Sequence, residues 1–294
     1  MNTRPQVSRT IALAVLCLLA CVDDCLAAEP MQYPLAVAVA DDGTIYVADL
    51  KLPGIWEIRE GTRREYFRGS KKFRTPLNAV RCLAIDQEGR LLAGDSATRE
   101  IYRFDADAKP QPLTDGKLGI PAALAVDAEG VIYVSDLETR RIWKVPAAGG
   151  EPVEVARIAG VRGMAFAEDG SLVVATALAP QVRKMAPDGT VTPVVTGRPL
   201  KFPQHLAITK TGTIYIADNY SAGLWKLAED GTPELWKTGK PFVRPVGLTA
   251  ADDVLYLADP HARSLFRVDQ AGKVTLIDGP PAAGVDSSTG DAAQ

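Results

Sequence analysis

The 294-residue sequence predicts an all-β fold: a six-bladed β-propeller of four-stranded antiparallel blades. Three observations predict it. One sequence pattern recurs six times at a nearly fixed period, each copy holds four short apolar or β-branched runs, and turn-forming residues separate those runs. No helical periodicity is present after the N-terminal segment. Residues 33–279 contain all six copies, so we expect one propeller domain.

Two markers measure the period of the repeat. A turn residue lies six positions before the residue that ends the second run; these pairs are Gly43/Asp49, Gly89/Asp95, Gly130/Asp136, Gly170/Thr176, Gly212/Asp218 and Asp253/Asp259. The third run begins six positions later, and successive copies are 46, 41, 40, 42 and 41 residues apart. Because a four-stranded propeller blade needs about 40 residues, each copy predicts one blade.

Each strand of a blade has its own signal in the sequence. In the fifth copy the first three runs are 206–208, 214–218 and 224–227, all rich in β-branched, aromatic or leucine residues. A fourth run closes each copy, as at 191–195. Asp-Gly pairs such as Asp42-Gly43 suit the tight turns between runs, because glycine readily adopts positive φ.

Residues 1–28 have the features of an export signal. Arg4 and Arg9 precede a ten-residue apolar run at 11–20, which is too short to span a bilayer. Small residues follow, so cleavage near Ala28 would release a secreted or periplasmic protein. We favour this interpretation over its alternative, a lipoprotein.

The lipoprotein alternative rests on residues 18–21, which resemble a lipobox and would place a lipid anchor at Cys21. No later segment is long and apolar enough for a membrane span. Residues 280–294 are rich in Gly, Pro, Ala, Ser and Asp, so we expect a short disordered C-terminal tail. Cleavage near residue 28 would leave Cys82 as the one cysteine, which predicts a small core residue rather than a disulfide framework.

The net charge of −3 argues against nucleic acid as a partner, because nucleic-acid binding needs a basic surface. We expect a monomer. In a propeller, the loops that lead into the inner strands share one face with the loops between second and third strands; we call it the channel face. Small residues before the inner strands predict an open funnel there. The polar residues expected on this face are Arg81, Arg162, Gln204, His205, Asn219 and His261.

Basic and aromatic residues in the loops at 71–74, 201–203 and 240–244 add to these side chains. Together they predict a cationic rim suited to a small anionic ligand, a peptide or a protein. The alternative is that the aromatic rings pack between blades while the lysines are merely solvated, and we favour that simpler interpretation.

Five aspartates end the second strands: Asp49, Asp95, Asp136, Asp218 and Asp259. A ring of carboxylates could hold calcium. We favour a structural role instead, because an Asp in this position accepts hydrogen bonds from the following backbone N–H groups. His205 and His261, the two histidines, are expected on neighbouring blades of the same face. With Asp218 or Asp259 they could bind zinc or act as an acid–base pair. The simpler interpretation, which we favour, is that the two histidines lie on the same polar face by chance.

These motifs resemble NHL repeats. Phe202-Pro203, the run 206–208, Gly212 and the run 215–218 follow the pattern of that family, whereas blade four lacks its Tyr and Asp at 173–176. The resemblance implies the propeller fold for residues 33–279. It implies little about function, because one fold hosts many functions.

Enzymes with similar propellers offer a comparison. The SMP-30/gluconolactonase group implies a divalent metal held by a first-blade Glu, but residues 33–36 contain none. The NHL-related amidating lyase implies several zinc-binding histidines, and virginiamycin B lyase-like propellers imply His and Glu on this face. No Ser-His-Asp or phosphate-binding motif allows a catalytic residue to be named. The sequence therefore favours an exported, non-enzymatic binding module; the alternative is a metal-dependent hydrolase or lyase, using zinc or calcium on the same face.

Overall fold

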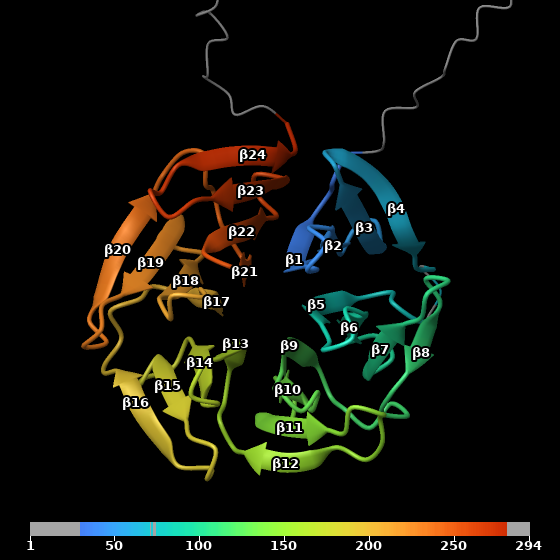
Figure 1. Cartoon of the computed structure of the whole chain (residues 1–294), viewed down its shortest axis with the longest axis horizontal. Helices are drawn as coiled ribbons and strands as arrows, with labels where there is room; N and C mark the ends of the chain where they lie inside the picture. Colours follow the sequence, from blue (N-terminus) through green and yellow to red (C-terminus); the bar gives the residue numbers. More distant parts are fainter. Residues whose placement is uncertain (1–29, 71, 73–74, 281–294) are drawn as a thin grey trace, which may run out of the picture.

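The computed structural model describes residues 30–70, 72 and 75–280, and these residues form a six-bladed propeller around a central channel (Figure 1). The predicted export signal at 1–28 lies outside the described residues, as does the predicted tail beyond residue 280. No helix in the described part of the chain is long and apolar enough to cross a membrane.

Each blade contributes one strand to each of four concentric positions. The inner strands are β1 (Pro34–Val39), β5 (Val80–Ile85), β9 (Pro121–Val126), β13 (Val161–Phe166), β17 (Pro203–Ile208) and β21 (Gly247–Ala251). The second strands are β2 (Ile45–Asp49), β6 (Leu91–Asp95), β10 (Ile132–Asp136), β14 (Leu172–Thr176), β18 (Ile214–Asp218) and β22 (Val254–Asp259). The third strands are β3 (Gly54–Arg59), β7 (Glu100–Phe104), β11 (Arg141–Val145), β15 (Val182–Met185), β19 (Gly223–Leu227) and β23 (Ser264–Val268). The outer strands are β4 (Thr62–Arg68), β8 (Pro110–Pro112), β12 (Val153–Ala156), β16 (Val191–Val195), β20 (Pro233–Thr238) and β24 (Val274–Asp278).

The sheets confirm the predicted fold class. Each contains four antiparallel strands in chain order, so every blade is one continuous piece of chain. Blade four forms the same sheet although its second strand lacks the Tyr and the Asp of the repeat. In blade two the second strand, β6, is buried throughout, whereas the inner strand β5 is partly exposed; in blade one every residue of the outer strand β4 is exposed or half-buried. Outer strands therefore have the weakest apolar pattern in the sequence.

The core lies between neighbouring blades rather than at the centre of the ring. Between blades one and two, for example, Ile55, Leu83 and Phe104 belong to one buried cluster. The predicted tight turns on this framework are also confirmed: Gly43 has a φ of 82° and donates its N–H to Ala40 O over 2.9 Å. Glycine adopts this conformation without the strain that a side chain would bring.

Blade six closes the ring against blade one without exchanging a strand. Met31, Val37 and Val47 of the first blade share a buried cluster with Ala258 and Leu265 of the last. Arg63 and Asp278 form an ion pair across the same junction. Side-chain packing and an ion pair therefore hold the ring shut. At this junction β1 lies beside β21 and β22 (Figure 1).

Candidate functional site

Asp218 fixes the loops of blade five on the channel face. Its buried carboxylate accepts backbone N–H bonds from Lys201 (2.7 Å) and Phe202 (3.0 Å), which precede β17. It also accepts bonds from Tyr220 (3.1 Å) and Ser221 (3.0 Å), which follow β18. One carboxylate therefore ties the segment before the inner strand to the loop after the second strand.

Asp259 makes the same arrangement in blade six. It accepts N–H bonds from Val243 (2.7 Å) and Arg244 (2.9 Å) on one side. His261 (3.0 Å) and Ala262 (2.9 Å) donate from the other side. Asp49, Asp95 and Asp136 bind equivalent loops, so the structural interpretation of the strand-ending aspartates is confirmed.

The predicted metal ligands are not brought together. The carboxylates of Asp218 and Asp259 already accept four backbone N–H bonds each. His205 Nδ1 lies 3.0 Å from Leu206 O, and the His261 ring packs edge-on to a tyrosine. Within the described ranges, no group of three or more His, Cys, Asp and Glu side chains is placed to hold a metal ion. The two carboxylates are therefore engaged by backbone N–H groups, and the two histidines contact a backbone carbonyl and an aromatic ring rather than one another.

The small residues before the inner strands have a packing role that the sequence did not predict. They lie where one inner strand passes the next: a Cβ on Gly163 would be 2.5 Å from Leu206 N. Cys82 occupies the same position in blade two and is buried, as predicted for a small core residue. Space between the backbones, rather than access to the channel, selects small side chains here.

His205 occupies this junction position in blade five. Burial of its imidazole outweighs hydrogen bonds to the backbone of Leu206 and Leu248 and lowers its pKa from 6.5 to about 4. The folded state thus keeps His205 uncharged at neutral pH. Since the unfolded chain takes up a proton first, His205 contributes a loss of stability that begins as the pH falls below 6.5 and levels off near pH 4.

We expect an NMR titration to show this directly. The chain has two histidines, so two ring Hε1 signals are expected, and a His261→Asn variant assigns them. The signal that remains in that variant should have a midpoint near pH 4. A midpoint near 6.5 for this signal would mean that the His205 ring is fully hydrated and does not occupy the blade junction.

On the channel face, an arginine from blade four and another from blade six flank a stacked pair of aromatic rings from blade five. The Arg162 guanidinium carbon lies 5.3 Å from the centroid of the Phe202 ring. Phe202 stacks on Tyr220 with centroids 5.0 Å apart and an interplanar angle of 21°. The Arg244 guanidinium carbon lies 5.8 Å from the Tyr220 centroid. We call Arg162, Phe202, Tyr220 and Arg244 the cation–aromatic row; each contact is within cation–π or stacking range.

Three arginines lie in or near the row. Burial, with a smaller contribution from Arg81, lowers the pKa of Arg162, so these two guanidinium groups lie close enough to repel each other. Arg81 Nε donates to Ser96 Oγ over 2.8 Å. Across the described residues, Arg81, Arg162 and Arg244 form no ion pair with Asp or Glu. The three guanidinium groups are therefore available to pair with an anionic ligand.

The remaining predicted site residues lie at different distances along the chain from the row and make different contacts. Asn219 Nδ2 donates to Arg244 O over 3.4 Å, and half-buried Gln204 follows Phe202 by two residues on β17. His261 packs against Tyr33 with ring centroids 6.0 Å apart. The structure thus places Asn219 beside the row, while His261 belongs to the neighbouring junction between blades six and one.

The comparisons with known proteins agree with this architecture. A gluconolactonase from Xanthomonas campestris superposes with a TM-score of 0.68 and 19% identity, covering 84% of this chain and 87% of that chain. Virginiamycin B lyase from Staphylococcus aureus gives a TM-score of 0.65 and 18% identity, covering 84% and 85%. A chain of a nidogen/laminin complex gives 0.65 and 18%, covering 80% and 90%. At these identities the likeness shows the fold alone.

The sequence family is shown by a different comparison. No curated protein sequence matches this chain significantly. The family model described as the SMP-30/gluconolactonase/LRE-like region matches residues 24–218, which is more than half of the 294-residue chain. The chain therefore belongs to the SMP-30/gluconolactonase/LRE-like family.

Proposed function

We propose that the chain is a binding module whose channel face takes an acidic, aromatic-containing segment of a partner protein. The cation–aromatic row carries this proposal. Its two arginines would pair with carboxylates, while Phe202 and Tyr220 offer flat faces on which another ring can stack. Because residues 1–28 have the features of an export signal, we propose that binding takes place outside the cytoplasm.

A peptide suits this surface better than a small anion. The Tyr220 side chain is 60% exposed, and Leu178 and Val243 on the flanking blades are also exposed. Exposed apolar side chains on three neighbouring blades favour an extended partner that covers them. The loop backbone N–H groups donate hydrogen bonds to Asp218 and Asp259, and these bonds hold the side chains in place before binding, which reduces the entropy lost on association.

The test uses a fluorescent peptide that alternates Asp or Glu with Tyr, measured by fluorescence anisotropy. We expect an Arg162→Gln/Arg244→Gln double variant to bind it about tenfold more weakly or worse, because two charge-assisted contacts are lost. Binding by the unchanged protein should also weaken as salt is raised from about 0.05 M to about 0.5 M. Arg157→Gln, which removes an exposed arginine paired with Glu154, is the matched control and should change little.

Two outcomes would contradict the proposal. One is equal binding of the peptide after every Asp and Glu has been replaced by Asn and Gln. The other is unchanged affinity in the double variant while its unfolding transition matches that of the original protein. Either result would show that the row does not recognise the acidic groups.

A hydrolase or lyase acting on the same face is the second candidate, and the family match favours it. A pH-stat assay with glucono-δ-lactone, with and without added zinc or calcium, tests this reaction separately. We expect no turnover above the uncatalysed rate, because the described residues assemble no metal-binding cluster. Turnover that is lost in Arg162→Gln would make the face catalytic and would replace the binding proposal.

A further inference from the structure

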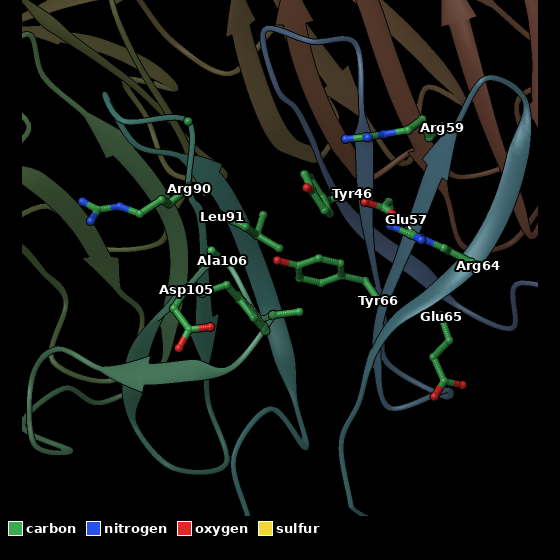
Figure 2. A pocket seen from close by; sticks show the side chains of 13 residues that line it. Tyr46, Glu57, Arg59, Arg64, Glu65, Tyr66, Arg90, Leu91, Asp105 and Ala106 are labelled. Atoms are coloured by element: carbon green, nitrogen blue, oxygen red, sulfur yellow. Dashed lines mark hydrogen bonds and ion pairs between the residues drawn. The ribbon is translucent and has the colours of Figure 1, made fainter.

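A cleft lies between blades one and two on the face opposite the channel face (Figure 2). Its volume is about 570 Å³, which is enough for a small ligand. Tyr46, Tyr66, Leu91 and Phe104 form its apolar lining, and the Tyr66 ring projects across it toward Leu91. Charged side chains, including Glu57, surround this apolar centre.

Glu57 inverts the charge of a repeated position. In each of the other five blades, the third-strand residue that pairs with the second-strand position equivalent to Tyr46 is basic. These residues are Arg103, Lys144, Lys184, Lys226 and Arg267. In blade one that partner, opposite Tyr46, is Glu57. The other five blades thus supply an internal comparison, and blade one alone places a carboxylate here.

The Glu57 side chain is 3% exposed, and it forms an ion pair with Arg64 of β4. The Arg64 side chain is 68% exposed, so water competes strongly for its guanidinium group. Burial raises the pKa of both Tyr46 and Tyr66, that of Tyr66 to about 12, and the negative charge of Glu57 adds to both shifts. Glu57 therefore places a negative charge inside the cleft, whereas Arg64, which pairs with it, lies largely on the surface.

Other charges around the cleft have partners outside it. Arg59 pairs with Asp42 over 2.8 Å. Arg90 pairs with Asp86 over 2.9 Å and with Glu88 over 2.6 Å. These arginines are therefore compensated, which leaves Arg64 as the cation that neutralises Glu57.

The aromatic side chains suit a cation as well. The Tyr46 and Tyr66 rings have centroids 4.9 Å apart, and those of Tyr66 and Phe104 are 5.1 Å apart. Ring faces attract weakly hydrated cations, and the attraction grows when water is excluded. We propose that this cleft binds a small organic ammonium ion, which displaces Arg64 from Glu57 and lies against Tyr46 and Tyr66.

Choline is the probe, and 3,3-dimethyl-1-butanol is its uncharged isostere. Binding is measured on the full chain by NMR titration. We expect choline to bind and the isostere not to saturate, because the isostere has the same shape without the charge. Glu57→Gln should weaken choline binding about tenfold, since the carboxylate is lost. Arg64→Gln should strengthen it by roughly threefold or more, since the internal competitor is removed.

Glu65→Gln is the matched control. Glu65 lies on the same outer strand as Arg64, pairs with Arg68 over 2.5 Å, and points away from Tyr66 in Figure 2. The Glu65→Gln substitution removes one negative charge from the rim of the cleft and leaves Glu57 and the aromatic lining unchanged. The opposite signs expected for Glu57→Gln and Arg64→Gln separate loss of the site from a general loss of folding.

Three results would overturn the proposal: no choline binding, equal binding of choline and its isostere, or equal effects of Glu57→Gln and Glu65→Gln. The site is independent of the channel face, so Arg162→Gln/Arg244→Gln should leave choline binding unchanged. A failure of one proposal is thus distinguishable from a failure of the other.

Discussion

Replacing Asp136 with alanine should lower the free energy of unfolding by about 3 kcal/mol. The buried Asp136 carboxylate accepts backbone N–H bonds from Gly119 (2.9 Å), Ile120 (3.0 Å) and Thr139 (3.1 Å) and an indole bond from Trp143 (3.2 Å). Alanine would leave several buried donors without an acceptor. In a chain of this size the melting temperature should fall by roughly 6–12 °C, which thermal unfolding followed by circular dichroism can measure.

Asp127→Ala in the same blade is the control. Asp127 accepts two backbone N–H bonds in the β9–β10 turn, where water can replace it, so we expect a loss below about 1 kcal/mol. Equal losses in the two variants would show that the strand-ending position has no special structural role.

The pH dependence of Asp136 provides a second readout. Burial alone would raise its pKa, but hydrogen bonds from Thr139, Gly119 and Ile120 outweigh burial and lower it from 3.8. The stability contributed by the ionised carboxylate is therefore complete above pH 3.8 and is lost as the pH falls through the lower folded-state pKa. The alanine variant should lack this part of the acid destabilisation.

Substituting valine for Gly247 should cost about 3 kcal/mol and open the junction between blades six and one. A Cβ at this position would lie 2.6 Å from Leu35 O and 2.9 Å from the Ala36 Cα. Both are backbone atoms of β1, so the clash can be relieved only by moving one blade away from the other. Urea unfolding measures the cost.

Thr249→Val on the same strand is the control, because it changes one polar atom without adding volume. Its effect should stay below about 1 kcal/mol. If Gly247→Val unfolds at the same urea concentration as Thr249→Val, the two blades do not approach each other as closely as the structure places them.

Spacing in the sequence was sufficient to predict the fold. The interval from turn residue to strand end persists even in blade four, where Thr176 replaces aspartate. There the Thr176 hydroxyl donates to Ala159 O over 3.0 Å and accepts the Leu178 N–H over 3.0 Å, which links the same two loops with fewer bonds. Strand pairing therefore depends on the period rather than on any single side chain.

The candidate site was less predictable, because its contacts join residues of different blades. Phe202 and Arg244 both directly precede the proline at the start of, or just before, an inner strand, and the structure holds them on either side of Tyr220. The distances between loops of neighbouring blades, however, depend on paths that strand spacing does not specify.

The charge inversion at Glu57 could also have been found from the sequence. Glu57 falls in the third run at a position where the other copies carry Lys or Arg. The partner of Glu57 could not have been found in this way, because the bulge at Ile55/Trp56 sets the register of β4 against β3 and places Arg64 opposite Glu57.

Ring closure without strand exchange has a consequence for synthesis of the chain. The apolar side of blade one that includes Val37, Val47 and Trp56 packs against Ala258 and Leu265, which lie more than 190 residues later in the sequence. Ribosomes make the first blade long before the last, so this surface stays uncovered while the intervening blades emerge. Until the final blade is made, the chain can therefore avoid aggregation in two ways: a chaperone can cover this apolar surface, or the last blade can fold onto it quickly after synthesis.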